Sequence, residues 1–545
     1  MLAYLDWLLH LAISPGRQLA LAEEARQALL QWLPVAPPAQ EGQPASAEDD
    51  VRGGDRRFDD PAWNTWPFDM LKRGFLLGQR WWQSAATGVR GVSRHHEDVV
   101  AFGARQWLDT LSPSNFLWTN PQALRAVQQE RGQGLARGML NLMDDAARLG
   151  GGTPPGHPSR FRPGHELAAT PGKVVFRNHL IELLQYSPVT ETVFPEPVLI
   201  VPSWIMKYYI LDLSPQNSLV RYLVSQGYTV FMVSWRNPGA EDRALDMADY
   251  LALGPVAAMD AVAELQPGRK VHAAGYCLGG TLLAIAAAAW AREGRDSLAS
   301  LTLLATQTDF EEPGELSLFI DDSQITYLED MMWQTGYLDG PQMGASFTYL
   351  NTRDLLWSRM VRDYLLGARL PPNDLTAWNL DTTRMPYQMH VQYLKSLYRD
   401  NALARGAYQV GDHPVALSDL DVPVFAVGTL KDHISPWRSV YKLHLLTDAE
   451  LSFVLTSGGH NAGILSEPGH AGRSYRIHGR PRNGKYLGPE EWLAQAEERE
   501  GSWWPAWQAW LAERSGPRTA PPPMCGVAGM GRVLRNAPGE YVLQR

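Results

Sequence analysis

The stretch Val271-His-Ala-Ala-Gly-Tyr-Cys277-Leu-Gly-Gly280 decides the fold of this chain. It opens on apolar residues and continues into an alanine-rich segment, Thr281 to Trp290. This order predicts a strand, a sharp turn and a helix, with Cys277 at the turn. The glycines around Cys277 allow a tight turn that leaves its side chain clear at the helix N-terminus. N–H groups at such an end stabilise a thiolate or an acyl oxyanion.

A cysteine between glycines can also be a small buried hydrophobe, so the motif needs partners. Asp432 lies in the loop after an apolar strand, Val422 to Val427, and His460 lies in the loop after another, Leu451 to Leu455. A loop aspartate is often a turn-former and a single histidine is often structural. Three such residues at strand ends, in the order nucleophile, acid, base, match the triad order of α/β hydrolases. We therefore predict that Cys277, Asp432 and His460 form a triad at the edge of the sheet where ligands bind.

Each member of the predicted triad has a chemical role. Cys277 is the nucleophile, and cysteine in place of the usual serine points from ester hydrolysis toward acyl transfer through a thioester. His460 takes up its proton and later activates an incoming hydroxyl, while Asp432 orients the imidazole. His433 is the competing base. Because it adjoins Asp432, it would not easily face Cys277 while that carboxylate supports another imidazole.

Two backbone N–H groups are expected to form an oxyanion hole. The elbow assigns one donor to Leu278. The second comes from the loop after the strand Pro197 to Val201, and the backbone of Ile205 is our candidate. Three neighbouring side chains are further pocket candidates: Trp204, Tyr209 and Asp212. For Asp212, a helix-capping or structural carboxylate is the alternative to direct catalysis.

Several long motifs outside the elbow resemble the poly(3-hydroxyalkanoate) synthases, a polyester polymerase family with a Cys-Asp-His triad on an α/β-hydrolase core. The resemblance spans roughly residues 55 to 515. It rests on Asp55-Arg-Arg-Phe58, Asp60-Pro-Ala-Trp63, Ser112 to Pro121, Tyr186-Ser-Pro188, Lys207 to Pro215, Ser218 to Gly227, Val233 to Pro238, Asp432-His433 and Gly458-Gly-His460.

The resemblance implies that the family's triad falls on Cys277, Asp432 and His460. It further implies (R)-3-hydroxyacyl-coenzyme A as substrate, polyester and coenzyme A as products, no metal or other cofactor, a homodimer, and a cytoplasmic location on polymer granules. The chain departs from the family pattern at Met206, where members often have Asn beside the oxyanion loop.

Composition sets the outer bounds. The chain has 545 residues, of which 45% are hydrophobic and 20% charged, as in globular proteins. Its formal charge of −9, with no basic block, argues against nucleic acid as a partner. It has two cysteines, Cys277 and Cys525, which favours a reducing compartment, and no apolar run long enough to span a membrane. The histidines at 95 and 96 superficially suggest a metal site, but adjacent helical side chains diverge, so we assign no metal.

The predicted fold class is α/β: an α/β-hydrolase core with a mainly parallel sheet, a helical cap inserted at about 307–420, and a mostly helical N-terminal domain. We expect amphipathic helices over 1–34, a linker over 35–60, the helical domain over 61–169, the catalytic domain over 170–515 and a flexible tail over 516–545. A helix is expected from Glu490 to Arg514. The aromatic-rich cap is either a gating lid or a rigid cover.

The sequence leaves alternatives open for the N-terminal helices and for the activity. The N-terminal helices, with leucines at helical spacing, either pack on the protein's own surface or bind a granule, a membrane or another subunit. For the activity, the alternatives to a polyester synthase are a thioesterase or polyester hydrolase, and a non-catalytic granule protein.

Overall fold

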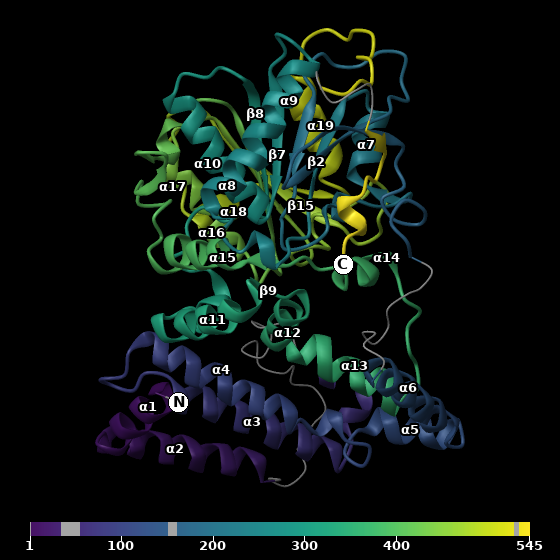
Figure 1. The fold of residues 1–545 in the computed structure, drawn as a ribbon. Coiled ribbons are helices and arrows are strands. Elements are labelled where there is room, and N and C mark those ends of the chain that lie inside the picture. The colour runs from purple at the N-terminus through teal and green to yellow at the C-terminus, as the bar shows by residue number, and fades with distance from the viewer. Residues whose placement is uncertain (1, 34–54, 151–160, 528–533) are drawn as a thin grey trace. The chain divides into compact units, whose positions relative to one another are not determined.

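The computed structural model describes residues 2–33, 55–150, 161–527 and 534–545 (Figure 1). The chain forms two compact units. One contains the residues up to His157 together with Ala345–Pro371, and the other contains Pro158–Gly344 and Pro372–Arg545. The expected linker over 35–60 lies mostly outside the described residues.

The first unit is helical, as predicted for the N-terminal region. Its helices are α1 (Leu2–Ala12), α2 (Pro15–Trp32), α3 (Phe68–Ala86), α4 (Arg94–Thr110), α5 (Pro121–Gln129) and α6 (Gln133–Gly150), followed later in the chain by the short α13 (Ser358–Met360). Helices α1 and α2 both bond to α3. The Trp7 indole N–H of α1 donates to the Ala85 carbonyl of α3 at 2.9 Å, and the Trp81 indole N–H of α3 donates to the Leu21 carbonyl of α2 at 3.0 Å.

The segment Ala345–Pro371 belongs to this helical unit, although the sequence assigned it to the cap. Its arginines pair with acidic residues of the N-terminal helices. Arg369 contacts Asp145 at 2.6 Å, and Arg353 contacts Asp109 at 3.4 Å. Because these ion pairs join residues more than 200 positions apart, no local sequence pattern predicts them. The predicted cap is therefore interrupted.

The second unit is built on an 11-stranded sheet with the order β16-β15-β14-β13-β8-β7-β3-β6-β2-β1-β17. The six central strands from β14 to β6 are parallel, and the outer pairs are antiparallel. The sheet strands are β1 (Gly172–Arg177), β2 (Ile181–Tyr186), β3 (Val198–Val201), β6 (Val230–Trp235), β7 (Val271–Tyr276), β8 (Leu298–Leu304), β13 (Val424–Thr429), β14 (Leu451–Thr456), β15 (Ser474–Arg480), β16 (Glu497–Glu500) and β17 (Arg535–Asn536).

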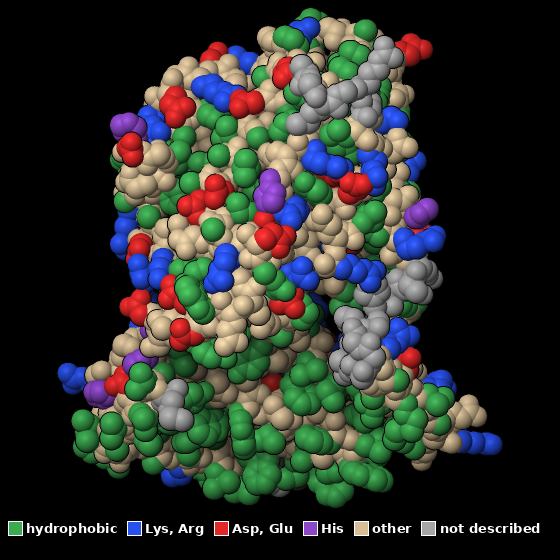
Figure 2. All heavy atoms as spheres, viewed as in Figure 1, with side chains coloured by type: hydrophobic (Ala, Val, Ile, Leu, Met, Phe, Trp, Pro, Cys, Tyr) green, Lys and Arg blue, Asp and Glu red, His purple; other side chains and the backbone are tan. Residues whose placement is uncertain are grey.

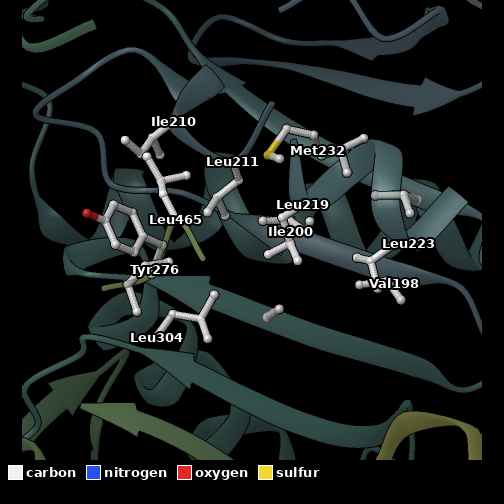
Figure 3. Close-up of a cluster of buried hydrophobic side chains, with 14 of the residues drawn as sticks. Val198, Ile200, Ile210, Leu211, Leu219, Leu223, Met232, Tyr276, Leu304 and Leu465 are labelled. Carbon is white, nitrogen blue, oxygen red and sulfur yellow. The ribbon is translucent and has the colours of Figure 1, made fainter. Parts of the chain in front are cut away.

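Helices cover both faces of this sheet, with α9 and α10 on one side and α7 and α19 on the other (Figure 1). The helices of the core are α7 (Leu219–Ser225), α8 (Met247–Leu251), α9 (Ala257–Leu265), α10 (Leu278–Arg292), α16 (Trp437–Tyr441), α17 (Leu443–Leu446), α18 (Pro489–Gln495) and α19 (Trp504–Ala512). Burial on both faces explains why the central strands read as continuous apolar runs. Figure 3 shows one such layer, where Val198 and Ile200 of β3 meet Leu219 and Leu223 of α7.

The cap segments of the second unit are mostly helical, as expected. They contain α11 (Asp322–Thr335), α12 (Gly340–Leu350, whose last residues belong to the first unit), α14 (Asp374–Asn379) and α15 (Tyr387–Tyr393), with the short pairs β9 (Tyr337–Leu338) and β10 (Met385–Pro386), and β11 (Tyr408–Val410) and β12 (His413–Val415). A further hairpin, β4 (Asp212–Ser214) with β5 (Asn217–Ser218), precedes α7. In the part of the chain that the structure describes, no helix combines the length and apolarity needed to cross a bilayer.

Two expectations near the C-terminus differ from the structure. The helix predicted from Glu490 to Arg514 is split into α18, the edge strand β16 and α19. Strand β16 has the sequence Glu-Glu-Arg-Glu with all side chains exposed, so only pairing with β15 makes it a strand. The predicted flexible tail is ordered over 534–545: β17 pairs with β1, and Val542 is buried.

Candidate active site

Cys277 occupies a strained turn between β7 and α10. Its backbone has φ 53° and ψ −126°, a conformation rare outside glycine, and its carbonyl accepts hydrogen bonds from the N–H groups of Gly280 and Thr281. A Cβ atom at Gly279 would lie closer than 3.0 Å to the carbonyl oxygens of Val201 and Pro202. The glycine therefore lets α10 approach the loop after β3, and the half-exposed thiol stands at the helix N-terminus.

The acid and the base come from the loops after β13 and β14. His460 Nδ1 lies 2.8 Å from Asp432 Oδ2, and both side chains are buried. Asp432 also accepts hydrogen bonds from the Thr429 hydroxyl at 2.9 Å and from the N–H groups of Ile434 and Ser435 at 2.9 and 2.8 Å. These donors fix the carboxylate so that one oxygen faces the imidazole.

The electrostatics of this pair reach Cys277. Burial alone disfavours a charged imidazole, but the charges of Asp432 and Cys277 and hydrogen bonds to both raise the pKa of His460 well above its ordinary value. Burial would also raise the pKa of Asp432, yet the His460 charge and the hydrogen bonds to the carboxylate hold that pKa below its usual range. The three side chains are thus electrostatically coupled, an arrangement that suits a cysteine nucleophile with a histidine base.

The two candidate oxyanion donors lie on α10 and on the loop after β3. Leu278 is the first residue of α10, and its N–H has no hydrogen-bond acceptor among the described residues. The Ile205 N–H makes a long bond of 3.4 Å to the Ser203 hydroxyl, and the Ile205 carbonyl accepts from the Thr383 N–H at 2.9 Å. The loop is thus held by the cap segment that contains Thr383.

The other pocket candidates differ in their surroundings. Trp204 is buried, with its ring 6.4 Å from that of Tyr393. The Tyr209 hydroxyl donates to Asp381 at 2.7 Å. Asp212 accepts from the hydroxyls of Thr170 and Ser218 at 2.5 and 2.7 Å, neither of which lies on the Cys277 loop. These contacts suit the structural alternative for Asp212.

The structure also places His433, the competing candidate for the base, and Met206, the residue that departs from the family pattern. His433 is half-buried, and the carboxylate of its neighbour Asp432 bonds the ring of His460 instead. Met206 is half-buried against the core and pairs with Thr382 in an isolated β-bridge. The backbone of Met206 therefore belongs to the same contact between loop and cap, while its side chain packs against the core.

Three tyrosines lie beside the thiol: the sequence placed Tyr393 and Tyr398 among the aromatics of the predicted cap but gave neither a place at Cys277, and it did not indicate Tyr276. Burial raises the pKa of Tyr276, Tyr393 and Tyr398, and in each case the neighbouring Cys277 adds to the shift. Contact with Tyr398 raises the pKa of Tyr393 further, whereas the hydrogen bond with Tyr393 lowers that of Tyr398. The Tyr276 hydroxyl donates to Asn461 at 2.5 Å, and its ring lies 5.6 Å from that of His460. Tyr393 and Tyr398 belong to α15 and the π-helical turn Leu394–Arg399. Residues five positions apart lie on the same side of a helix only where it has a wider, π-helical turn, and the sequence does not predict such a turn here.

The matches to known proteins agree with this geometry. Residues 54–223 match the family model described as "Poly-beta-hydroxybutyrate polymerase (PhaC) N-terminus", and residues 196–467 match the α/β hydrolase fold. A poly(3-hydroxyalkanoate) polymerase from Methylorubrum extorquens is 41% identical over 90% of this chain and 80% of its own length. The chain belongs to the poly(3-hydroxyalkanoate) polymerase family.

Another member of the poly(3-hydroxyalkanoate) polymerase family, the polymerase subunit PhaC of Cupriavidus necator, is 38% identical over 90% of this chain and 83% of its own. Among solved structures, a thermophilic esterase from Thermogutta terrifontis aligns with 63% of this chain and 98% of its own, at 17% identity and a TM-score of 0.31. So low a score adds no argument. Within the described ranges, no group of three or more His, Cys, Asp or Glu side chains is arranged to hold a metal ion.

Proposed function

We propose that this chain polymerises (R)-3-hydroxyacyl-coenzyme A into poly(3-hydroxyalkanoate) through a thioester on Cys277. The observation that supports this best is the hydrogen-bonded pair of Asp432 and His460, whose imidazole is electrostatically coupled to Cys277 at the N-terminus of α10. Membership in the poly(3-hydroxyalkanoate) polymerase family supplies the substrate class.

In the first step, the Cys277 thiolate attacks the carbonyl carbon of the acyl thioester. The carbon–sulfur bond to coenzyme A breaks, and coenzyme A leaves as a thiol after taking the proton held by His460. The helix N-terminus at Leu278 and the backbone of Ile205 are the proposed donors to the transient oxyanion. One thioester is exchanged for another, so this step is close to balanced in energy.

In the second step, the 3-hydroxyl of a chain end attacks the acyl group on Cys277. His460 takes the hydroxyl proton, the bond to sulfur breaks, and an ester forms. Passing from a thioester to an ester is downhill. Aromatic side chains support the proposal, because rings near the thiol would favour attack by a chain-end hydroxyl over hydrolysis of the thioester by water: Tyr276, Tyr393 and Tyr398 lie beside Cys277, and Trp204 lies beside Tyr393.

The deciding experiment incubates purified protein with (R)-3-hydroxybutyryl-coenzyme A and follows both coenzyme A and the acyl product. Release of coenzyme A with insoluble polyester is the expected result. Release with free 3-hydroxy acid would instead indicate a hydrolase, and absence of release would indicate a non-catalytic relative. Cys277→Ala should abolish release while Cys525→Ala, which alters the other cysteine, should retain it.

We further propose that the helical unit binds the polyester product. One face of α1 packs inward through Ala3 and Trp7, whereas Leu2, Leu5 and Leu9 are exposed by 50 to 70%. Figure 2 shows hydrophobic side chains gathered over the helices of this unit. Exposed apolar surface of this kind suits an aliphatic polymer granule. The homodimer implied by the family is a separate proposal, which sedimentation of the purified chain tests.

A further inference from the structure

The C-terminal residues Tyr541–Gln544 hold the loop that carries the candidate oxyanion donor Ile205. The Lys207 side chain, which is 2% exposed, donates to the Gln544 carbonyl at 2.7 Å and to the Tyr541 carbonyl at 3.3 Å. A buried lysine that bonds two carbonyls rather than a carboxylate is unusual. The charge of Asp381 also favours the charged form of this lysine.

The same loop is fastened on its other side by the cap. The Lys207 N–H donates to the Asp381 carbonyl, the Thr383 N–H donates to the Ile205 carbonyl, and the Thr383 hydroxyl donates to the Trp204 carbonyl. The loop between β3 and β4 therefore has its backbone bonded to the cap and its one lysine bonded to the chain end.

The same C-terminal residues also bond to the loop after β6, which contains Asn237 and itself contacts the cap at Arg384. The Asn237 N–H donates to the Gln544 side-chain oxygen at 3.0 Å, and the Asn237 side chain accepts from the Arg384 N–H at 2.8 Å. Farther along, Glu182 accepts from the N–H groups of Glu540 and Tyr541 at 2.8 and 3.0 Å. The end of the chain is thus anchored to the sheet and reaches both loops.

We infer that Lys207 is a positioning residue for the oxyanion hole: by binding the carbonyls of Tyr541 and Gln544, it uses the chain end as a strap that sets the place of the Ile205 backbone. This inference rests on the proposed function. A displaced donor weakens stabilisation of the transition state more than binding of the substrate, because the oxyanion exists only during reaction.

The charge of Lys207 gives the inference a second readout. Burial lowers the pKa of Lys207 to about 8, while Asp381 raises it and Arg384 lowers it, both from the cap segment. Above that pH the ammonium is lost, and with it the charge-assisted bonds to the strap. Lys207→Arg keeps the charge at all working pH values.

The test compares the wild type, Lys207→Met and Lys207→Arg in single-turnover release of coenzyme A. We expect Lys207→Met to slow release about tenfold or more with KM changed less than about twofold. Lys207→Arg should restore most of the rate and move the alkaline loss of activity to higher pH. Hydrogen exchange of residues 203–209 should be faster in Lys207→Met, while 271–277 stay protected.

The control is Lys173→Met, which removes a 2.6 Å contact with Asn536, a residue of β17 that precedes the Tyr541–Gln544 strap. It should leave the rate within about twofold of the wild type. Equal losses in Lys173→Met and Lys207→Met, or a Lys207→Met enzyme with wild-type rate and wild-type exchange, would overturn the inference.

Two further outcomes are covered. If Lys207→Met does not fold, Lys207→Gln takes its place, because a neutral and shorter side chain loses the charge-assisted bonds to the Tyr541 and Gln544 carbonyls; an unchanged rate and unchanged exchange at 203–209 would overturn the inference. If the wild type itself releases no coenzyme A, the proposed function fails, and exchange of the loop alone decides whether the strap positions it.

Discussion

In the proposed mechanism, the thiol of Cys277 divides the reaction into two steps. A serine in the same strained turn would have to form an alkoxide, and an alcohol is both a weaker acid and a weaker nucleophile than a thiol. We therefore expect Cys277→Ser to keep the fold and to lose at least about 100-fold in coenzyme A release. Stopped-flow detection of free thiol measures the rate, and circular dichroism measures the fold.

Cys525→Ser is the matched control for that substitution, because the second cysteine is also half-buried but lies outside the triad. It should release coenzyme A at the wild-type rate. A serine variant at 277 that reacts as fast as the wild type would mean that the sulfur is not the attacking atom.

Asp212 predicts a pH dependence of stability. Burial raises its pKa from 3.8 to about 6. Between these values the folded chain keeps a proton that the unfolded chain has lost, so the free energy of unfolding falls as pH rises from about 4 to 6. Asp212→Asn removes this cost. We take the difference in the free energy of unfolding between Asp212→Asn and the wild type. This difference should be about 1–3 kcal/mol more favourable to the variant at pH 8 than at pH 4.

Urea unfolding at both pH values measures this difference. Asp374→Asn is the control, because Asp374 accepts from Ser214 in the same hairpin and its replacement leaves Asp212 in place. An Asp212→Asn variant that is equally shifted at pH 4 and pH 8 would show that the carboxylate is not the source of the effect.

At this scale, the sequence was enough to predict which residues could meet but not everything that surrounds them. Asp432 and His460 follow recognisable strands, so topology alone brings their loops to the edge where Cys277 lies, and the structure places the two side chains 2.8 Å apart. Tyr393 and Tyr398 carry no such signal. Their approach to Cys277 depends on the path of the cap, which is a tertiary property.

Among the elements, α10 depends on the absence of a side chain at Gly279. A methyl group there would meet the carbonyls of Val201 and Pro202, which are backbone atoms and cannot rotate away. We expect Gly279→Ala to push α10 from the loop after β3, to cost about 2 kcal/mol or more, and to reduce coenzyme A release strongly. Thermal unfolding and turnover measure the two effects.

Gly78→Ala is the control, because a Cβ atom at Gly78 in α3 meets no atom within 4 Å. It should be neutral or stabilising by up to about 1 kcal/mol. If Gly279→Ala were equally neutral, the close approach of α10 to the loop would not be needed for folding or for reaction.

Strands that are buried on both faces were readable from the sequence, whereas strands made by pairing were not. The run Val424–Thr429 is fully buried and apolar, so its composition predicts a central strand. The charged run Glu497–Glu500 favours helix by local preference and becomes a strand only beside β15. Likewise, the chain end is ordered by Lys207 and Glu182, whose distance in sequence hides the contact.

For the whole molecule, the candidate active site and the exposed apolar helices belong to different units. Leu2, Leu5 and Leu9 are exposed on α1 of the helical unit, and Cys277, Asp432 and His460 belong to the other unit. We expect replacement of these three leucines by Gln to leave coenzyme A release in solution within about twofold, since no triad contact changes. Binding to polyester particles should fall at least about tenfold, because each leucine loses roughly 1 kcal/mol or more of apolar burial.

Cosedimentation with amorphous polyester particles measures that binding. Leu445→Gln is the matched control, because Leu445 is 60% exposed and lies on α17 of the catalytic unit. It should bind particles as the wild type does. If the triple variant bound equally well, or if Leu445→Gln lost as much binding, the helical unit would not be the part of the molecule that meets the polymer, and the exposed leucines of α1 would need another partner.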